Sequence, residues 1–229
     1  MRAVLIPIAL ATLAACSPRP AGAPKTAAAA PETKAAPAVA KAPREAPAGV
    51  YTLDPEHTSV VFRVPHMGLS RYTARFTRVD GQLTFDPANP AAQSVTATID
   101  AGSLATSYPD PAKLDFDAQV EKEFLDAAKH PQITFRSTKV EPTGAETARV
   151  TGDLTLHGVT RPVVLEVTYN GGYKGGGMDP NPRIGFSAHG SFKRSDFGIA
   201  FGVPAPGTTF GVGDDVEVII ETEFTKPAG

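Results

Sequence analysis

The sequence predicts an all-β fold, an eight-stranded antiparallel barrel with one helix in the long connection between strands 3 and 4. From Val50 onward, short runs of alternating β-branched or aromatic and polar residues are separated by clusters of Gly, Pro, Asn and Asp, which is typical of antiparallel β proteins. Strands with one apolar and one polar face require the sheet to close over its apolar side. Eight up-and-down strands favour a barrel, whose interior holds side chains or one small apolar ligand.

The eight predicted strands repeat apolar residues at every second position, opposite mostly Thr, Arg, Asp and Glu. In order, we expect them at 51–64, 72–86, 93–102, 132–140, 147–157, 161–174, 183–195 and 214–225. The residues that define one face of each strand are, in the same order, Val60, Phe62 and Val64; Leu83 and Phe85; Val95, Ala97 and Ile99; Ile133 and Phe135; Val150, Leu154 and Leu156; Val163, Leu165, Val167 and Tyr169; Ile184, Phe186 and Phe192; and Val216, Val218, Ile220 and Phe224.

One segment between the third and fourth strands has helical instead of β periodicity. Asp115 or Asp117 is placed to cap its start, and Pro131 stops its continuation. We expect a helix of about three turns that plugs or covers one barrel mouth. The apolar residues that recur at spacings of three and four are Phe116, Val120, Phe124, Leu125 and Ala128.

A second long connection, 197–213, combines flexibility with apolar residues. Five glycines alternate there with apolar side chains. Two interpretations stand side by side: the segment is a lid or portal, or its phenylalanines pack on the end of the barrel. The apolar side chains are Phe197, Ile199, Phe201, Val203 and Phe210.

The N-terminus has the pattern of a bacterial lipoprotein signal. Arg2 precedes an uncharged, mostly apolar run that ends in Leu-Ala-Ala-Cys at 13–16, and this run is too short for a transmembrane helix. It resembles a lipobox, so we expect a signal peptide over 1–15 and lipidation of Cys16. Cys16 is the single cysteine, which excludes an internal disulfide and a multi-thiolate metal site. In this resemblance, Ser17 in place of aspartate favours the outer membrane.

Residues 16–49 read as a tether between the lipid anchor and a barrel domain over 50–227. Segment 17–49 contains 13 alanines and 7 prolines and carries a net charge of +3, from five Lys and Arg and two Glu. Such a composition forms no core and behaves as a semi-stiff spacer. The rest of the chain, from Val50, has 16 Lys and Arg against 22 Asp and Glu. This acidic balance argues against a nucleic-acid partner.

Several motifs in the barrel segment, over about 51–225, resemble the YceI-like family of polyisoprenoid-binding proteins. They are HTSVVFRVPHMG at 57–68, GQLTFD at 81–86, HPQITFRSTK at 130–139, GDLTLHGVTRP at 152–162 and RSDFG at 194–198. The resemblance implies a lipocalin-like eight-stranded antiparallel barrel that holds a long isoprenoid chain, such as a quinone tail, in its apolar interior. Many family members have Arg-Asp-x-His-Leu after the third strand. This sequence has SYPDPAKLDFD at 107–117 instead, so polar contacts near that mouth are not carried over.

Catalytic and metal patterns are weak in this sequence. The five histidines form no His-x-His or His-x-x-x-His pair, and we predict no metal site. The run around Ser187 has one residue too many for a nucleophile elbow. Arg194 and Asp196 could orient a ligand head group, but local hydrogen bonds that pin the lid turn are the favoured role. We therefore expect a binding protein and not an enzyme.

The predicted function is carriage or storage of a polyisoprenoid or similar long-chain amphiphilic lipid, in a lipid-anchored protein of the bacterial envelope that faces the periplasm. No cofactor is expected beyond a bound isoprenoid or quinone, and exposed strand edges allow a homodimer. The alternative is a stress-related envelope interaction module with a fully packed barrel and no ligand. The predicted chain-lining residues are Phe62, Phe76, Leu83, Phe85, Phe135, Leu154, Leu156, Leu165, Phe186, Phe192, Phe197, Phe201 and Ile220.

Overall fold

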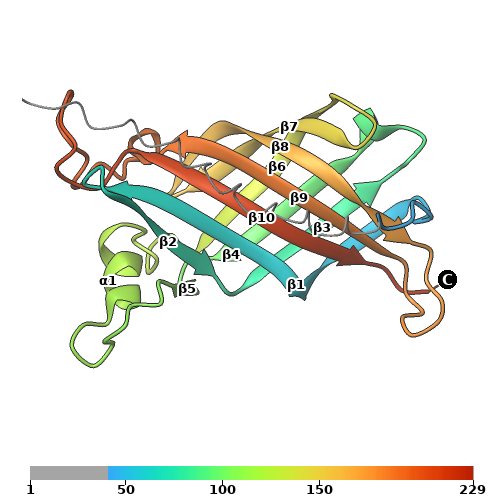
Figure 1. The fold of residues 1–229 in the computed structure, drawn as a ribbon, viewed down its shortest axis with the longest axis horizontal. Helices are drawn as coiled ribbons and strands as arrows, with labels where there is room; N and C mark the ends of the chain where they lie inside the picture. Colours follow the sequence, from blue (N-terminus) through green and yellow to red (C-terminus); the bar gives the residue numbers. More distant parts are fainter. Residues whose placement is uncertain (1–40, 229) are drawn as a thin grey trace, which may run out of the picture. The chain divides into compact units, whose positions relative to one another are not determined.

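A computed structural model describes residues 41–228 and shows a closed antiparallel β-barrel (Figure 1). The predicted signal peptide, Cys16 and the tether as far as residue 40 lie outside the described residues. Within 41–228 no helix is long and apolar enough to cross a membrane. The elements are β1 (Gly49–His66), β2 (Ser70–Phe76), β3 (Val79–Phe85), η1 (Pro90–Ala92), β4 (Ser94–Asp100), β5 (Leu104–Ala105), α1 (Phe116–Glu123), β6 (Gln132–Pro142), β7 (Thr147–Leu156), β8 (Val159–Tyr173), β9 (Arg183–Lys193), η2 (Arg194–Phe197) and β10 (Asp215–Thr225).

The barrel closes through the pairing of its first and last strands. The strand order is β10-β9-β8-β7-β6-β4-β3-β1-β2-β5, and β10 also pairs with β1, in a register that places Phe62 opposite Val218. Every pairing between these strands is antiparallel. The predicted eight-stranded barrel is thus confirmed. Because β1 and β10 share a ladder, they offer no free edges for the proposed dimer, which stays untested.

Two of the eight barrel strands are broken, which the sequence did not predict. The expected strand 72–86 divides into β2 and β3 at Thr77 and Arg78, and both halves pair with β1. The next strand divides into β4 and the short β5, which pairs with β2. Ser103 stabilises the break: its carbonyl accepts the Thr77 N–H at 2.9 Å, and its hydroxyl accepts the Arg78 N–H at 3.1 Å. Backbone groups that leave the ladder are thereby satisfied.

Helix α1 is shorter than predicted, with eight residues in place of about three turns. Its start is as expected, because the carboxylate of Asp115 accepts the Ala118 N–H at 3.0 Å. Its C-cap is Phe124, whose N–H donates to the carbonyl of Val120, and the left-handed φ of 46° at Asp126, two residues further on, prevents a helical continuation. The helix lies beside β2 and β5 at one end of the barrel (Figure 1).

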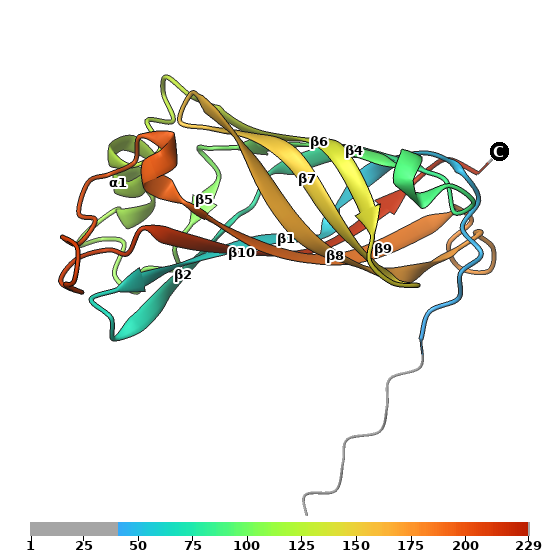
Figure 2. The same ribbon diagram turned by 90° about the horizontal axis from the view of Figure 1, so that it is seen from above.

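The described part of the predicted tether, 41–48, contacts the barrel. Arg44 forms a bridge with Gly172, and its guanidinium pairs with Glu146, which also binds Lys41 at 2.9 Å. The side chain of Ala46 is buried. Gly171 and Gly172 allow this approach, since a Cβ on Gly171 would lie 2.6 Å from that of Ala42. This contact lies at the end of the barrel away from α1 (Figure 2). We call that end the tether end.

Candidate functional site: an apolar cavity in the barrel

The interior of the barrel encloses a cavity of about 620 Å³. This volume lies within the range of roughly 300–1,000 Å³ that is typical of small-molecule sites. Every barrel strand and α1 contribute side chains to its wall, and most of these are aliphatic or aromatic. The alternation predicted from the sequence explains this, because successive side chains of a strand point to opposite faces.

Ten of the thirteen predicted chain-lining residues line this cavity. Their contact with a ligand stays a prediction. These ten are Phe62, Phe76, Leu83, Phe135, Leu154, Leu156, Leu165, Phe186, Phe192 and Ile220.

The other three predicted residues, Phe85, Phe197 and Phe201, are absent from the cavity wall. Phe85 is buried between Tyr51 and Tyr169, with ring centroids 6.1 and 5.8 Å away. Phe197 is buried in η2 against Phe192, 5.1 Å between ring centroids. Phe201 is exposed on the 199–213 loop.

Helix α1 and the two residues that follow it supply four wall residues that the predicted set omitted. Phe116 and Val120 in α1, with Phe124 and Leu125 after it, line the cavity at the end of the barrel where α1 lies. The ring of Phe116 meets that of Tyr72 at 5.6 Å, in an edge-to-face arrangement. The three- and four-residue spacing of these apolar residues was the signal for this role, since it placed them on one helix face.

A cluster of aromatic rings lies at the tether end of the barrel. Tyr51, Phe85, Tyr169, Phe186 and Phe224 follow one another with ring centroids 5.5 to 6.3 Å apart. The hydroxyl of Tyr51 donates a hydrogen bond to the carbonyl of Pro47 at 2.7 Å. Burial, together with the neighbouring Tyr169, raises the pKa of Tyr51 to about 12. We call this cluster the aromatic floor; of its rings, those of Phe186 and Phe224 line the cavity.

The opposite end, which we call the lid end, is organised by the buried side chain of Arg194. Its guanidinium donates hydrogen bonds to four backbone carbonyls at 2.7 to 2.9 Å. Burial lowers the pKa of Arg194, against the opposing effect of Asp214. The sequence favoured local hydrogen bonds from Arg194 and Asp196. Arg194 pins the loop, and the carboxylate that binds the turn is that of Asp214, which accepts from the N–H and the hydroxyl of Ser195. The four carbonyls belong to Ile199, Phe201, Val212 and Gly213.

Polar side chains line the cavity at both ends. Thr58, Gln93, Ser94 and Thr222 lie toward the tether end, and a second set lies near the lid end. His66, Ser70, Tyr72, Thr106 and Tyr108 line the cavity there, beside α1 and the 199–213 loop. The carboxylate of Asp117 accepts the backbone N–H of Thr106 at 2.8 Å, which orders the segment that departs from the family pattern. The lid end can therefore hydrogen-bond a polar head group, while most of the remaining wall is apolar and suits a hydrocarbon chain.

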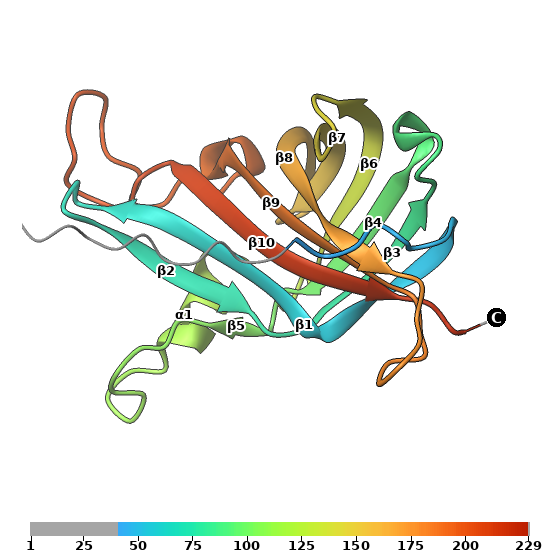
Figure 3. The same cartoon turned by 45° about the vertical axis from the view of Figure 1, so that its right-hand side comes forward.

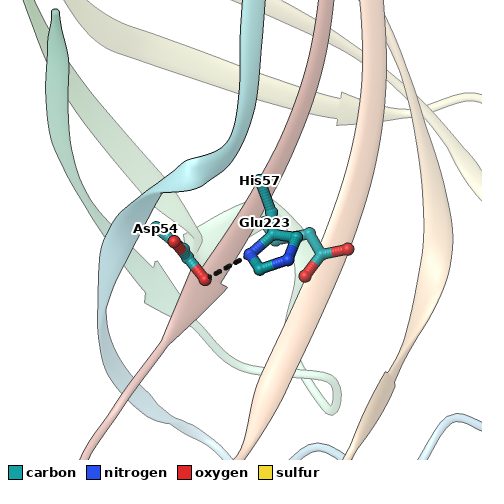
Figure 4. Close-up of side chains that lie close together, drawn as sticks. All are labelled: Asp54, His57 and Glu223. Carbon is teal, nitrogen blue, oxygen red and sulfur yellow. Dashed lines mark hydrogen bonds and ion pairs between the residues drawn. The ribbon is translucent and has the colours of Figure 1, made fainter.

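A cluster of charged residues lies on the outside of the barrel, between β1, β9 and β10. The ligand atoms of Asp54, His57 and Glu223 lie within 4.8 Å of one another, as a metal site would require (Figure 4). Arg183 occupies this cluster: its Nη1 lies 2.6 Å from carboxylate oxygens of both Asp54 and Glu223, and its Nε binds Asp179 at 3.0 Å. The guanidinium already balances these carboxylates, so the arrangement is an ion-pair network.

The network predicts an acid-sensitive contribution to stability. Burial opposes ionisation of Asp54, but hydrogen bonds from Arg183 and His57 outweigh it and lower the pKa of Asp54 to about 2, against 3.8. The contribution is present above pH 3.8 and is lost as the pH falls through 2. We expect it to be about 2 kcal/mol, measured by urea unfolding of the wild type and Asp54→Asn between pH 5 and pH 2. Equal acid sensitivity of the two proteins would contradict this, and exposed Asp80→Asn is the control.

Comparisons with known proteins agree with this architecture. The YceI-like domain family matches residues 51–224. A UPF0312 protein of Pseudomonas syringae pv. syringae is 40% identical over 160 residues, which cover 68% of this chain and 79% of that protein. A UPF0312 protein of Vibrio cholerae is 39% identical over 161 residues, 69% of this chain and 81% of that one.

Solved structures share the barrel. BcnA of Burkholderia cenocepacia superposes with a TM-score of 0.61 at 27% identity, over 75% of this chain and 98% of that one. The YCEI protein of Campylobacter jejuni gives a TM-score of 0.59 at 30% identity, and the match covers 71% of this chain and 89% of that one. A domain of Saccharophagus degradans described as polyisoprenoid binding gives a TM-score of 0.58, and the match covers 77% of this chain and 98% of that one. At 15% identity, this likeness shows the shared fold alone. The family match over most of the barrel, together with these relatives, shows that the chain belongs to the YceI-like family.

Proposed function

We propose that this protein binds a polyisoprenoid or similar long-chain amphiphilic lipid, for example through a quinone tail, and acts as its carrier or store. The observation that carries the proposal is the apolar cavity of about 620 Å³ inside the barrel. A chain that buries roughly 400 Å² there gains about 10 kcal/mol before the costs of ordering are subtracted. The description of the Saccharophagus degradans domain as polyisoprenoid binding points to the same ligand class.

We orient the ligand from the chemistry of the cavity wall. Aromatic rings cluster at the tether end, so the apolar tail points toward Phe186 and Phe224. The polar head group then lies at the lid end, near His66, Tyr72 and Tyr108. The alternative, an interaction module with a fully packed barrel, is disfavoured by a cavity of this size.

The setting that we propose for this activity is the bacterial envelope. Cleavage after residue 15 and lipidation of Cys16 anchor the protein, with the barrel facing the periplasm and the outer membrane as the favoured location. Two or three acyl chains give almost irreversible anchoring, at about 0.8 kcal/mol per buried methylene. We further propose that the protein binds its ligand without turnover and without a metal or other cofactor.

Native mass spectrometry of the full chain, purified in mild detergent from its own host, tests the proposal. We expect one hydrophobic molecule per barrel, recovered unaltered in mass by solvent extraction. A chemically altered product that accumulates with time would contradict binding without turnover. A ligand-free barrel from the native envelope would overturn the carrier role.

A further inference from the structure

We infer that the lid end of the barrel docks onto the surface of a lipid bilayer, through an uncharged apolar rim on the side of the cavity mouth formed by residues 66–70 and 199–213. This inference rests on the proposed lipid-binding function and adds the surface from which the ligand is exchanged. The rim is formed by Leu69, Phe201 and Phe210, which are 84%, 73% and 81% exposed. Large apolar side chains that project into solvent around one opening are typical of an interaction site.

Two segments that are distant in the sequence combine to form the rim. Leu69 lies on the turn between β1 and β2, and the two phenylalanines lie on the 199–213 loop (Figure 3). The N–H of Met67 donates to the carbonyl of Gly211 at 2.8 Å, and the N–H of Gly213 donates to that of Pro65 at 2.7 Å. These bonds make the turn and the loop one surface.

The rim is continuous with the cavity wall. The ring of Phe201 meets that of Phe124 at 5.8 Å, and Phe124 lines the cavity. Val212 and His66 form a β-bridge with each other and line the cavity as well. A chain that leaves the cavity at this end therefore passes directly onto apolar side chains.

The absence of charge from both segments favours a bilayer as the partner. Residues 66–70 and 199–213 contain no Lys, Arg, Asp or Glu, whereas the segment 107–117 beside the same mouth contains four. The side formed by the two uncharged segments can therefore face lipid without desolvating such a group. Backbone groups of irregular loops are not tolerated in the hydrocarbon core, which limits insertion to the depth of the head groups. Phenylalanine and leucine at that depth bury apolar surface as interfacial segments do.

The predicted lipidation of Cys16 would hold the barrel close to a bilayer. Between Cys16 and Lys41 lie 24 residues, which reach about 80 Å at full extension. The longest strand, β1, has 18 residues and extends about 60 Å. The lid end can thus contact the anchoring membrane even though the tether leaves from the opposite end.

Single-tryptophan variants of the full chain test the docking, because the protein has no tryptophan. Phe210→Trp reports on the rim. Tyr173→Trp, at an exposed site of the tether end, is the matched control. The chains are reconstituted in phosphatidylcholine vesicles that carry a nitroxide on the head group, a quencher that stays at the surface. We expect at least twofold stronger quenching of Phe210→Trp than of Tyr173→Trp, and equal or reversed quenching would overturn the inference.

A second pair of variants separates this inference from the proposed function. Phe201→Glu combined with Phe210→Glu is expected to slow transfer of lipid from vesicles at least tenfold while the barrel still binds lipid presented in detergent. As the control at the tether end, Tyr173→Glu combined with Met178→Glu is expected to leave both the transfer rate from vesicles and the binding of detergent-presented lipid unchanged. If detergent-presented lipid binds but transfer is unaffected by the rim variant, only the docking surface is refuted. If no variant and no wild-type protein binds lipid, the proposed function itself fails.

Discussion

Replacing Leu165 by glutamate is expected to reduce lipid binding at least a hundredfold. Leu165 lies on β8 and its side chain lines the cavity. A carboxylate there must either stay ionised in an apolar wall or take up a proton, and both states disfavour a bound hydrocarbon chain. The measurement is titration of the full chain with a detergent-presented isoprenoid, followed by native mass spectrometry of the complex.

The adjacent residue provides the matched control. Val164 points to the outside of the same strand and is 41% exposed, so Val164→Glu should bind lipid as the wild type does. Far-UV circular dichroism checks that both variants keep the barrel. Similar binding by the two variants would show that the cavity is not the lipid site. Loss of binding in Val164→Glu alone would show that the outer face binds the ligand.

Replacement of Arg194 by methionine should destabilise the protein by about 3 kcal/mol, because four backbone carbonyls at the lid end lose their donor. Methionine keeps much of the apolar stem but donates no hydrogen bond. The effect should appear as a lower urea midpoint and as faster proteolysis within 199–213, since the loop depends on these bonds.

Lys193→Met is the control for this variant. Lys193 is exposed and forms ion pairs with Asp214 and Asp215, and exposed pairs contribute about 0–1 kcal/mol. We expect its unfolding free energy to stay within that range of the wild type. A loss below 1 kcal/mol in Arg194→Met, with an unchanged proteolysis rate, would contradict the pinning role.

The sequence predicted the barrel and most of its wall because alternation reports directly on which face a side chain occupies. Leu154 and Leu156 illustrate this, as both line the cavity. Alternation does not report how far along the barrel axis a residue lies. Phe85 shows the limit: it is buried, but its neighbours Tyr51 and Tyr169 place it in the aromatic floor.

Features that depend on hydrogen bonds between distant segments were not predictable. The break at Thr77 and Arg78 has no glycine or proline to mark it and depends on Ser103, 26 and 25 residues away. Phe197 and Phe201 are four residues apart, yet one is buried and the other exposed. Phe197 lies in η2 and packs on Phe192, whereas Phe201 lies on the loop whose backbone Arg194 holds, and no local pattern encodes these contacts.

The orientation that we propose for the ligand has a consequence for its exchange. With its tail toward Phe186 and Phe224, a bound lipid would enter the barrel tail first and leave head group first. Under the proposed function, the head group would stay at the lid end for as long as the lipid is bound, and an occupied barrel would differ from an empty one at that surface.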